Sequence, residues 1–444
     1  MSVANNNEIV QAYISNYRTF EESLNGSRDM PFHELRRQAI ACFSKLGFPT
    51  PRSEEWKYTN VAPILARQFG ATQTDLEVTA AEVEELTFKG LTENVIVFVN
   101  GRFAESLSRI KITAKGIIIK SLAKALVENT DLVTAYLGRH ARFETEAFTA
   151  LNTAFTGDGL FIHVADNVVA DETVHVVHIS RPEGDGFVAH PRTLFVVGKN
   201  SRLKVVESFS GQGTGAYFNN LVGEVVVNEN GNFDHVKIQD ENLDAFHISS
   251  VQIHQERNSV VSTVTVDLGG ALVRNNLNVL FNGPNCETHL FGFFMGRGTQ
   301  LIDNHTFIDH AMPHCFSNEL YKGVLDDRAR GVFSGKILVR QDAQKTNALQ
   351  SNKTLLLTDE AVINAKPQLE IFADDVKCTH GATIGQLDDE AMFYLRARGI
   401  SAEVAGAMLR HAFISDVLAN IKHDCVREKL DATIIKRFTN GKMT

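Results

Sequence analysis

The strongest constraint on the fold is a series of short apolar runs between Gly159 and about Thr383. Apolar and polar residues alternate within them with a period of two, and Gly, Asn and Asp stand between them. This pattern predicts β-strands and leaves little room for crossover helices, which excludes a doubly wound α/β sheet. The clearest runs are 159–164, 174–179, 193–197, 202–208, 219–227, 235–239, 246–255, 259–267, 271–281 and 286–294.

An all-β sandwich, barrel, propeller or solenoid could hold so many short strands. We favour a solenoid, because the strands are short and numerous and because Gly and Asn recur where corners would fall. The Trp-Asp signature of a propeller blade is absent. No strict sequence repeat is visible either, so periodicity alone does not decide between these folds.

The segments on either side of the strand series have helical spacing. Residues 8–24, 32–46 and 121–155 place apolar residues three or four apart, while residues 95–99 form a short β run. That run ends at Asn100-Gly101, a dipeptide typical of a two-residue hairpin turn.

After Gln386 the pattern is helical again. Asp388 is placed to cap one helix and Ser401 the next, and a last helix is expected over residues 425–438. We therefore predict three domains: a mainly helical one with some β-structure over residues 1–156, a β core over 157–384 and a helical one over 385–444.

Composition excludes several classes of function. The net charge is −9, and no basic run is long enough to follow a nucleic acid backbone. No apolar stretch reaches membrane-spanning length, and the polar N-terminus does not resemble a secretory leader. The five scattered cysteines contain no Cys-x-x-Cys pair, which indicates reduced thiols and a cytoplasmic protein.

Motifs for nucleotide and hydrolase chemistry are missing. Gly198-Lys199 and Gly335-Lys336 lack the neighbours that a phosphate-binding loop needs, so the chain should bind no nucleotide by itself. The Gly-rich run 211–215 is read as an inter-strand loop, because no helix pattern follows it. Zinc-protease and nucleophile-elbow motifs are also absent.

Cys378 and His380 form the main candidate site. They follow a segment with strand character, and residues two apart on a strand point to the same face. A thiolate beside an imidazole is half of a site suited to iron, zinc or an iron–sulfur cluster, and a partner surface would supply the rest. The plainer interpretation is a packed thiol and a hydrogen-bonded histidine.

Three other features carry weaker hypotheses. The cluster from His305 to Cys315 is dense in ligand types, but alternation should scatter it over both faces of a strand and a turn. The acidic run 388–390 fits a helix N-terminus better than acid–base chemistry. The C-terminal helices could be a docking surface or a cap over one end of the solenoid.

Read together, these segments resemble the SufB/SufD family of iron–sulfur cluster assembly proteins. The core of the match is the run Lys377-Cys378-Thr379-His380-Gly381-Ala382-Thr383, where SufB-type chains carry Glu-His-Glu-Ala-Thr. The chain also lacks the cysteine-rich N-terminal motif of many SufB-type chains, and both points favour the SufD branch. Further matching segments are 54–58, 335–337, 341–346, 373–376, 385–387, 393–396 and 398–400.

The resemblance implies a right-handed parallel β-helix flanked by helical regions. It also implies a non-catalytic scaffold that pairs with a SufB-like paralogue through the β-helix and docks the SufC ATPase on its C-terminal helices, with the contacts expected between about residues 385 and 424. A transient iron–sulfur cluster or iron would lie at the interface with SufB, with His380 as a ligand and Cys378 as a weaker candidate. Two alternatives stay open: a purely structural β-helix homodimer, and an enzyme acting on polysaccharide in an open groove.

Overall fold

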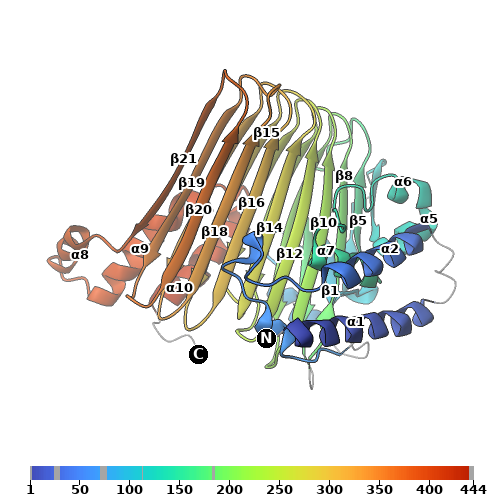
Figure 1. Ribbon diagram of the computed structural model, residues 1–444. Coiled ribbons are helices and arrows are strands. Elements are labelled where there is room, and N and C mark those ends of the chain that lie inside the picture. The colour runs from blue at the N-terminus through green and yellow to red at the C-terminus, as the bar shows by residue number, and fades with distance from the viewer. Residues whose placement is uncertain (1–2, 25–30, 71–77, 113, 183–185, 440–444) are drawn as a thin grey trace.

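The computed structural model describes residues 3–24, 31–70, 78–112, 114–182 and 186–439. Its centre is a parallel β-solenoid of about eight turns, with helices toward both termini (Figure 1). Among the described residues, successive strands of each turn join an 11-stranded sheet and a 10-stranded sheet in alternation. The mainly β fold with a solenoid core, predicted from the sequence, is confirmed.

The strands of the two sheets run parallel and in register through the solenoid. The 11-stranded sheet has the order β2 (Arg102–Phe103), β1 (Asn94–Val99), β6 (Val174–Ser180), β9 (Arg202–Gly211), β11 (Asn232–Asp240), β13 (Val260–Asp267), β15 (Glu287–Gly296), β17 (Phe316–Leu325), β19 (Asn347–Leu356) and β21 (Lys377–Gly385), with β3 (Arg109–Ile110) on β1. The 10-stranded sheet has the order β20 (Val362–Ile371), β18 (Arg330–Val339), β16 (Leu301–His310), β14 (Leu272–Phe281), β12 (Phe246–Gln255), β10 (Phe218–Val227), β8 (Arg192–Val197), β5 (Gly159–Val164) and β4 (Ile117–Ser121), with β7 (Val188–Ala189) on β10.

Helices lie before and after the strands. The helical elements are α1 (Val3–Ser23), α2 (Pro31–Leu46), η2 (Glu54–Trp56), α3 (Ala62–Leu65), α4 (Ala80–Leu86), η3 (Glu105–Leu107), α5 (Leu122–Glu128), α6 (Thr130–Thr134), α7 (Ala147–Phe155), α8 (Asp389–Arg396), α9 (Ala402–Leu418) and α10 (Asp424–Thr439). The helices predicted over 8–24, 32–46 and 425–438 correspond to α1, α2 and α10. The segment 121–155, predicted as helical, holds three short helices in place of one long one.

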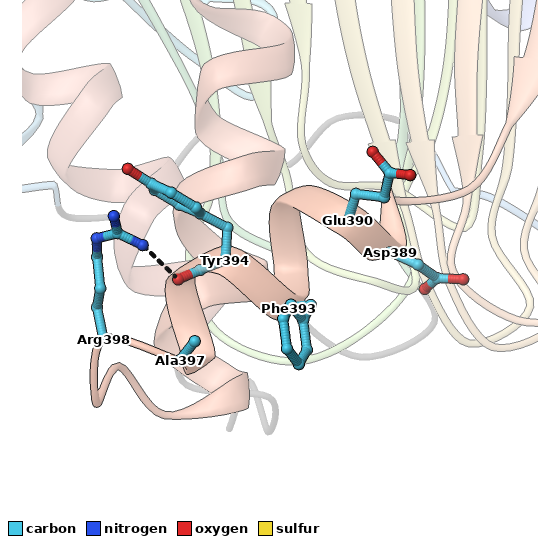
Figure 2. A pocket seen from close by; sticks show the side chains of 6 residues that line it. All are labelled: Asp389, Glu390, Phe393, Tyr394, Ala397 and Arg398. Carbon is cyan, nitrogen blue, oxygen red and sulfur yellow. Dashed lines mark hydrogen bonds between the residues drawn. The ribbon is translucent and has the colours of Figure 1, made fainter.

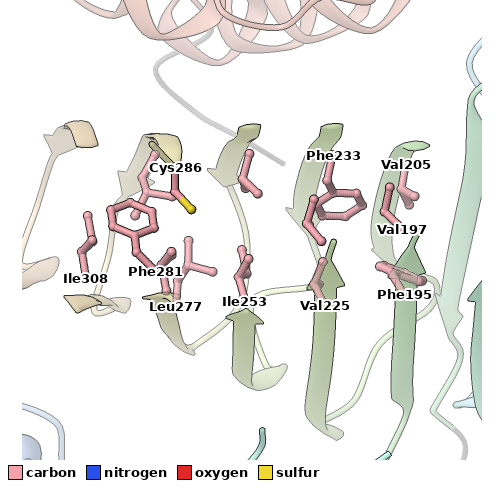
Figure 3. Close-up of a cluster of buried hydrophobic side chains, with 14 of the residues drawn as sticks. Phe195, Val197, Val205, Val225, Phe233, Ile253, Leu277, Phe281, Cys286 and Ile308 are labelled. Carbon is pink, nitrogen blue, oxygen red and sulfur yellow. The ribbon is translucent and has the colours of Figure 1, made fainter. Parts of the chain in front are cut away.

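Inward-facing side chains stack from turn to turn and form the core. One such column runs along the 10-stranded sheet, and each of its members lies opposite the next in register; Figure 3 shows part of it. Five consecutive members are Phe195, Val225, Ile253, Val279 and Ile308. Each buried apolar side chain of this size stabilises the fold by about 1.5–3 kcal/mol. Apolar residues that recur at the same inward position of each turn therefore stabilise the solenoid even without a strict sequence repeat.

Asparagines occupy one corner of successive turns. Asn200, Asn230, Asn258 and Asn285 have φ between 53° and 59°, a left-handed conformation that Asn tolerates better than most residues. The side-chain amide of each donates to the amide oxygen of the one before, at 2.8–3.2 Å, beginning with Asn200 donating to Asn167. The recurrence of Asn in the sequence therefore reports a stacked corner of the solenoid.

Strands from the N-terminal region extend both sheets at the first turn. β1 pairs in parallel with β6, and β4 pairs antiparallel with β5. The predicted hairpin is present: Asn100 and Gly101, with φ of 48° and 78°, join β1 to β2. The first edge of each solenoid sheet is thus covered by the chain itself.

The helices cover the outer faces of the sheets. An aromatic-rich cluster packs α1, α2 and α7 against β10, β12 and β14, whereas α9 and α10 pack on the outer face of the other sheet. α8 follows β21 and stands away from the sheets (Figure 1). The C-terminal helices therefore cover a face of the solenoid and not its end. The predicted division at residues 156/157 and 384/385 into domains stays a prediction.

Candidate functional site

Cys378 and His380 lie on β21, the last strand of the 11-stranded sheet. They are in register with Ala348 and Gln350 of β19, both of which are buried on the inward face. Because side chains alternate along a strand, Cys378 and His380 share that inward face. The sequence prediction that the two side chains project together agrees with this register, and their role as metal ligands stays a prediction.

The two candidate ligands differ in exposure. His380 is exposed, because no strand in the described part of the chain follows β21 in its sheet, whereas Cys378 is half-buried and packs against the main core cluster. Burial raises the pKa of the Cys378 thiol above its ordinary value. Cys378 is therefore a protonated thiol at neutral pH, and a metal would have to displace its proton.

The solenoid ends at two sheet edges that the chain leaves without a neighbouring strand. Within the described residues, β20 and β21 are terminal in their sheets (Figure 1). Apolar side chains are exposed along this end, among them Phe372 at 64% and Ile384 at 52%. Unpaired strand edges beside apolar surface are a template for pairing with another chain. We refer to β20, β21 and the Phe372 segment as the open end.

A second exposed surface lies on α8. Phe393 is 74% exposed and Tyr394 55%, and the Arg398 guanidinium stacks on the Tyr394 ring at 3.4 Å. Figure 2 shows the shallow depression that these residues line with Asp389, Glu390 and Ala397. Exposed aromatic side chains and arginine are enriched at protein interfaces, so this surface is a candidate docking site.

The acidic run before α8 is a helix cap, as the sequence favoured. The Asp388 carboxylate accepts hydrogen bonds from the backbone N–H groups of Glu390, at 2.8 Å, and Ala391, at 3.2 Å. Ser401 caps α9 in the same way by accepting from Val404.

The cluster from His305 to Cys315 is scattered, as alternation indicated. His305 faces outward and lies 3.0 Å from Asp303, while His310 faces inward and lies 2.9 Å from the Ser317 hydroxyl. His314 is in a turn with φ of 62°, and Cys315 is buried in the core. Across the described part of the chain, no group of three or more His, Cys, Asp or Glu side chains is arranged to hold a metal ion.

The structure also explains the run 54–58, whose position the sequence could not give. Trp56 stacks under the Arg274 guanidinium at 3.8 Å, and Arg274 pairs with the buried Asp303 at 2.7 Å. Thr59 donates a hydrogen bond to the same carboxylate, and Glu54 pairs with Lys366. The run anchors the N-terminal region on the 10-stranded sheet. Its partners lie more than two hundred residues away in sequence, so no local signal identifies them.

The fold is that of a parallel β-solenoid protein, and comparisons with known proteins identify the family. Residues 178–413 match the family described as "SUF system FeS cluster assembly, SufBD core domain", and residues 7–176 match the "SufBD protein N-terminal region". The chain belongs to the SufBD family of iron–sulfur cluster assembly proteins.

Several relatives match along most of their length. An iron–sulfur cluster assembly SufBD family protein of Synechocystis is 33% identical over 90% of this chain and 89% of its own length. The iron–sulfur cluster assembly protein SufD of Escherichia coli is 27% identical over 91% of this chain and 93% of its own length. The iron–sulfur cluster assembly protein SufD of Bacillus subtilis is 25% identical over 91% of this chain and 93% of its own length. In the described residues, no helix is long and apolar enough to cross a membrane.

Proposed function

We propose that this chain is a non-catalytic scaffold subunit of a cytoplasmic Suf complex, and that it pairs through its open end with a SufB-like paralogue. One observation carries the proposal: two neighbouring inward-facing columns of the solenoid end on β21, the terminal strand of its sheet among the described residues, in an exposed histidine and a half-buried cysteine. A second β-solenoid placed on the open end would continue both sheets and cover His380.

In this arrangement iron or a nascent iron–sulfur cluster is cargo, held for a time at the junction of the two chains. The imidazole of His380 supplies one nitrogen ligand and the thiol of Cys378 a possible sulfur ligand, a set that suits iron. Both point to the open end from one face of β21, and the partner would complete the coordination. A site divided between two chains can be opened by moving one chain against the other.

The motion would come from a SufC-type ATPase docked on the C-terminal helices. The α8 surface supports this part of the proposal, because it is aromatic, exposed and connected directly to β21. ATP binding and hydrolysis by that partner would supply differential free energy between the closed and open junction. The chain itself would bind no nucleotide.

The test is the iron and sulfide content of the purified complex after ATP turnover. His380→Ala should yield complex of normal composition that holds little cluster. Thr379→Ala is the matched control, because Thr379 is its neighbour on β21 and faces the opposite side. Normal cluster content in His380→Ala would refute the ligand role, and absence of a paralogue from the complex would refute the pairing.

A homodimer is the second candidate, because the open end would also accept a second copy of this chain. It predicts that mutation of both Cys378 and His380 leaves function intact. Polysaccharide chemistry has less support, because the Asp388 carboxylate is engaged in capping α8.

A further inference from the structure

Two buried polar side chains lie directly inside His380. Glu319 of β17 is in register with Gln350 of β19, and Gln350 is in register with His380 of β21. The three therefore occupy one inward-facing column on successive turns, separated by about 4.7–4.9 Å per turn. Only the last of them reaches the open end.

The amide of Gln350 is oriented by its neighbours. Its Nε2 donates to Glu319 Oε2 at 2.8 Å, and both side chains are nearly inaccessible, at 3% and 1% exposure. Gly335 of β18 provides the room, because a Cβ atom there would lie 2.4 Å from Gln350 Nε2. An ionised carboxylate only accepts hydrogen bonds, so it holds the NH₂ end of the amide toward Glu319.

The other end of the amide has no partner among the described residues. Gln350 Oε1 is buried and accepts no hydrogen bond from them, although buried polar atoms in folded proteins nearly always do. The next residue outward in the column is His380, whose ring can donate an N–H from either nitrogen. A buried acceptor without a donor among the described residues therefore lies one turn inward of a ring that can supply one.

We propose that Gln350 is a positioning residue for His380: its Oε1 accepts the N–H of one imidazole nitrogen and leaves the other nitrogen bare for a metal. Histidine ligands commonly donate their second ring nitrogen to such an acceptor, which fixes the tautomer and the ring orientation. Glu319 acts one step further in by keeping the amide of Gln350 from turning over. The metal-binding role of this arrangement rests on the proposed function of His380, but the proposed hydrogen bond does not.

The ring nitrogens of His380 report the arrangement directly. The full-length chain, labelled with ¹⁵N in its histidine rings, is measured by NMR at about pH 8. Burial raises the pKa of Glu319 to about 7, so its carboxylate is mostly ionised at this higher pH. The signals of His380 are assigned by their loss in His380→Ala. Wild type should show one dominant neutral tautomer, and Gln350→Met should show a mixture of both.

Asn352→Leu is the matched control. Asn352 lies two residues along β19 on the same buried inward face, but it is in register with Ala382 and not with His380. Its replacement should leave the tautomer of His380 unchanged. If Gln350→Met does not fold, Glu319→Gln replaces it, because a second amide no longer fixes which end of Gln350 faces inward. A mixed tautomer in wild type, or one dominant tautomer retained after the loss of Gln350, would overturn the proposal.

A Co²⁺ titration of the same proteins separates this inference from the proposed function. Loss of a hydrogen bond to a ligating histidine typically weakens metal binding about 10–100-fold, which is the decrease expected for Gln350→Met. If His380→Ala binds Co²⁺ as well as wild type, His380 is not a ligand and the proposed function fails. The tautomer measurement would still decide whether Gln350 orients the ring.

Discussion

At the scale of single residues, Glu319 makes the stability of the protein depend on pH. Burial raises its pKa from 4.5 to about 7, and the hydrogen bond from Gln350 offsets part of the effect. The folded state therefore binds this proton more tightly than the unfolded state. The resulting stabilisation is complete below pH 4.5 and is lost as pH rises through about 7.

Glu319→Gln should remove this dependence. The rise in the pKa of Glu319 corresponds to up to about 3 kcal/mol of unfolding free energy. As pH rises from 5 to 8, the variant should therefore gain stability relative to wild type by an amount of that order. Urea unfolding of both proteins across this pH range measures the difference between their unfolding free energies. The contributions of the buried histidines are the same in both proteins and drop out of this difference. Parallel stability curves would show that Glu319 keeps its ordinary pKa.

The candidate ligands show how much of a site one sequence can give. The spacing of Cys378 and His380 predicted a shared face, and the register of β21 agrees. Their exposure could not be predicted, because an inward position is buried in every turn except the last. Gln350 was not found from the sequence at all, since its relation to His380 is a contact between strands about thirty residues apart.

At the scale of elements, local sequence signals identified where helices begin better than they identified what each helix packs against. Asp388 and Ser401 cap α8 and α9 as predicted. Nothing local showed that α9 and α10 bury the outer face of the 11-stranded sheet while α8 stays exposed. Deleting everything beyond Gln386 would therefore expose that face as well as remove a docking surface, and point changes on α8 are the cleaner test.

Phe393→Asp should abolish binding of a SufC-type ATPase without loss of stability. The side chain is 74% exposed, so the change should alter the unfolding free energy by no more than about 0.5 kcal/mol, whereas an aromatic hot spot contributes about 2 kcal/mol or more to an interface. Val127→Asp is the control, because Val127 is 70% exposed on α5, away from the C-terminal helices. Calorimetric titration with the ATPase measures both. Equal affinities for the two variants would exclude α8 as the docking site.

At the scale of the whole molecule, the two ends of the solenoid differ in whether further strands pair with the strands of the coil. At the first turn β1 and β4 cover the sheet edges, but at the last turn no described strand does so. Alternation in the sequence predicted the coil, since every turn repeats the same inward and outward pattern. It did not predict that β1 would pair with β6, because the intervening β4 and β5 join the other sheet and adjacency in sequence does not determine adjacency in space.

The unpaired edges of β20 and β21 predict that two chains pair through the open end. Ile384→Lys places a charge at the last inward position of β21, where the side chain is 52% exposed, so the isolated chain should fold with unchanged stability. Association through the open end should weaken at least about 30-fold, as loss of a hot-spot residue does, because the lysine would be buried without a partner. Leu243→Lys is the control, since Leu243 is 47% exposed in the turn between β11 and β12. Sedimentation velocity of each variant, alone and mixed with a SufB-like paralogue, distinguishes the partners. Loss of the mixed complex supports the scaffold, and loss of self-association alone supports the homodimer. If neither complex is lost, the interface lies away from the open end.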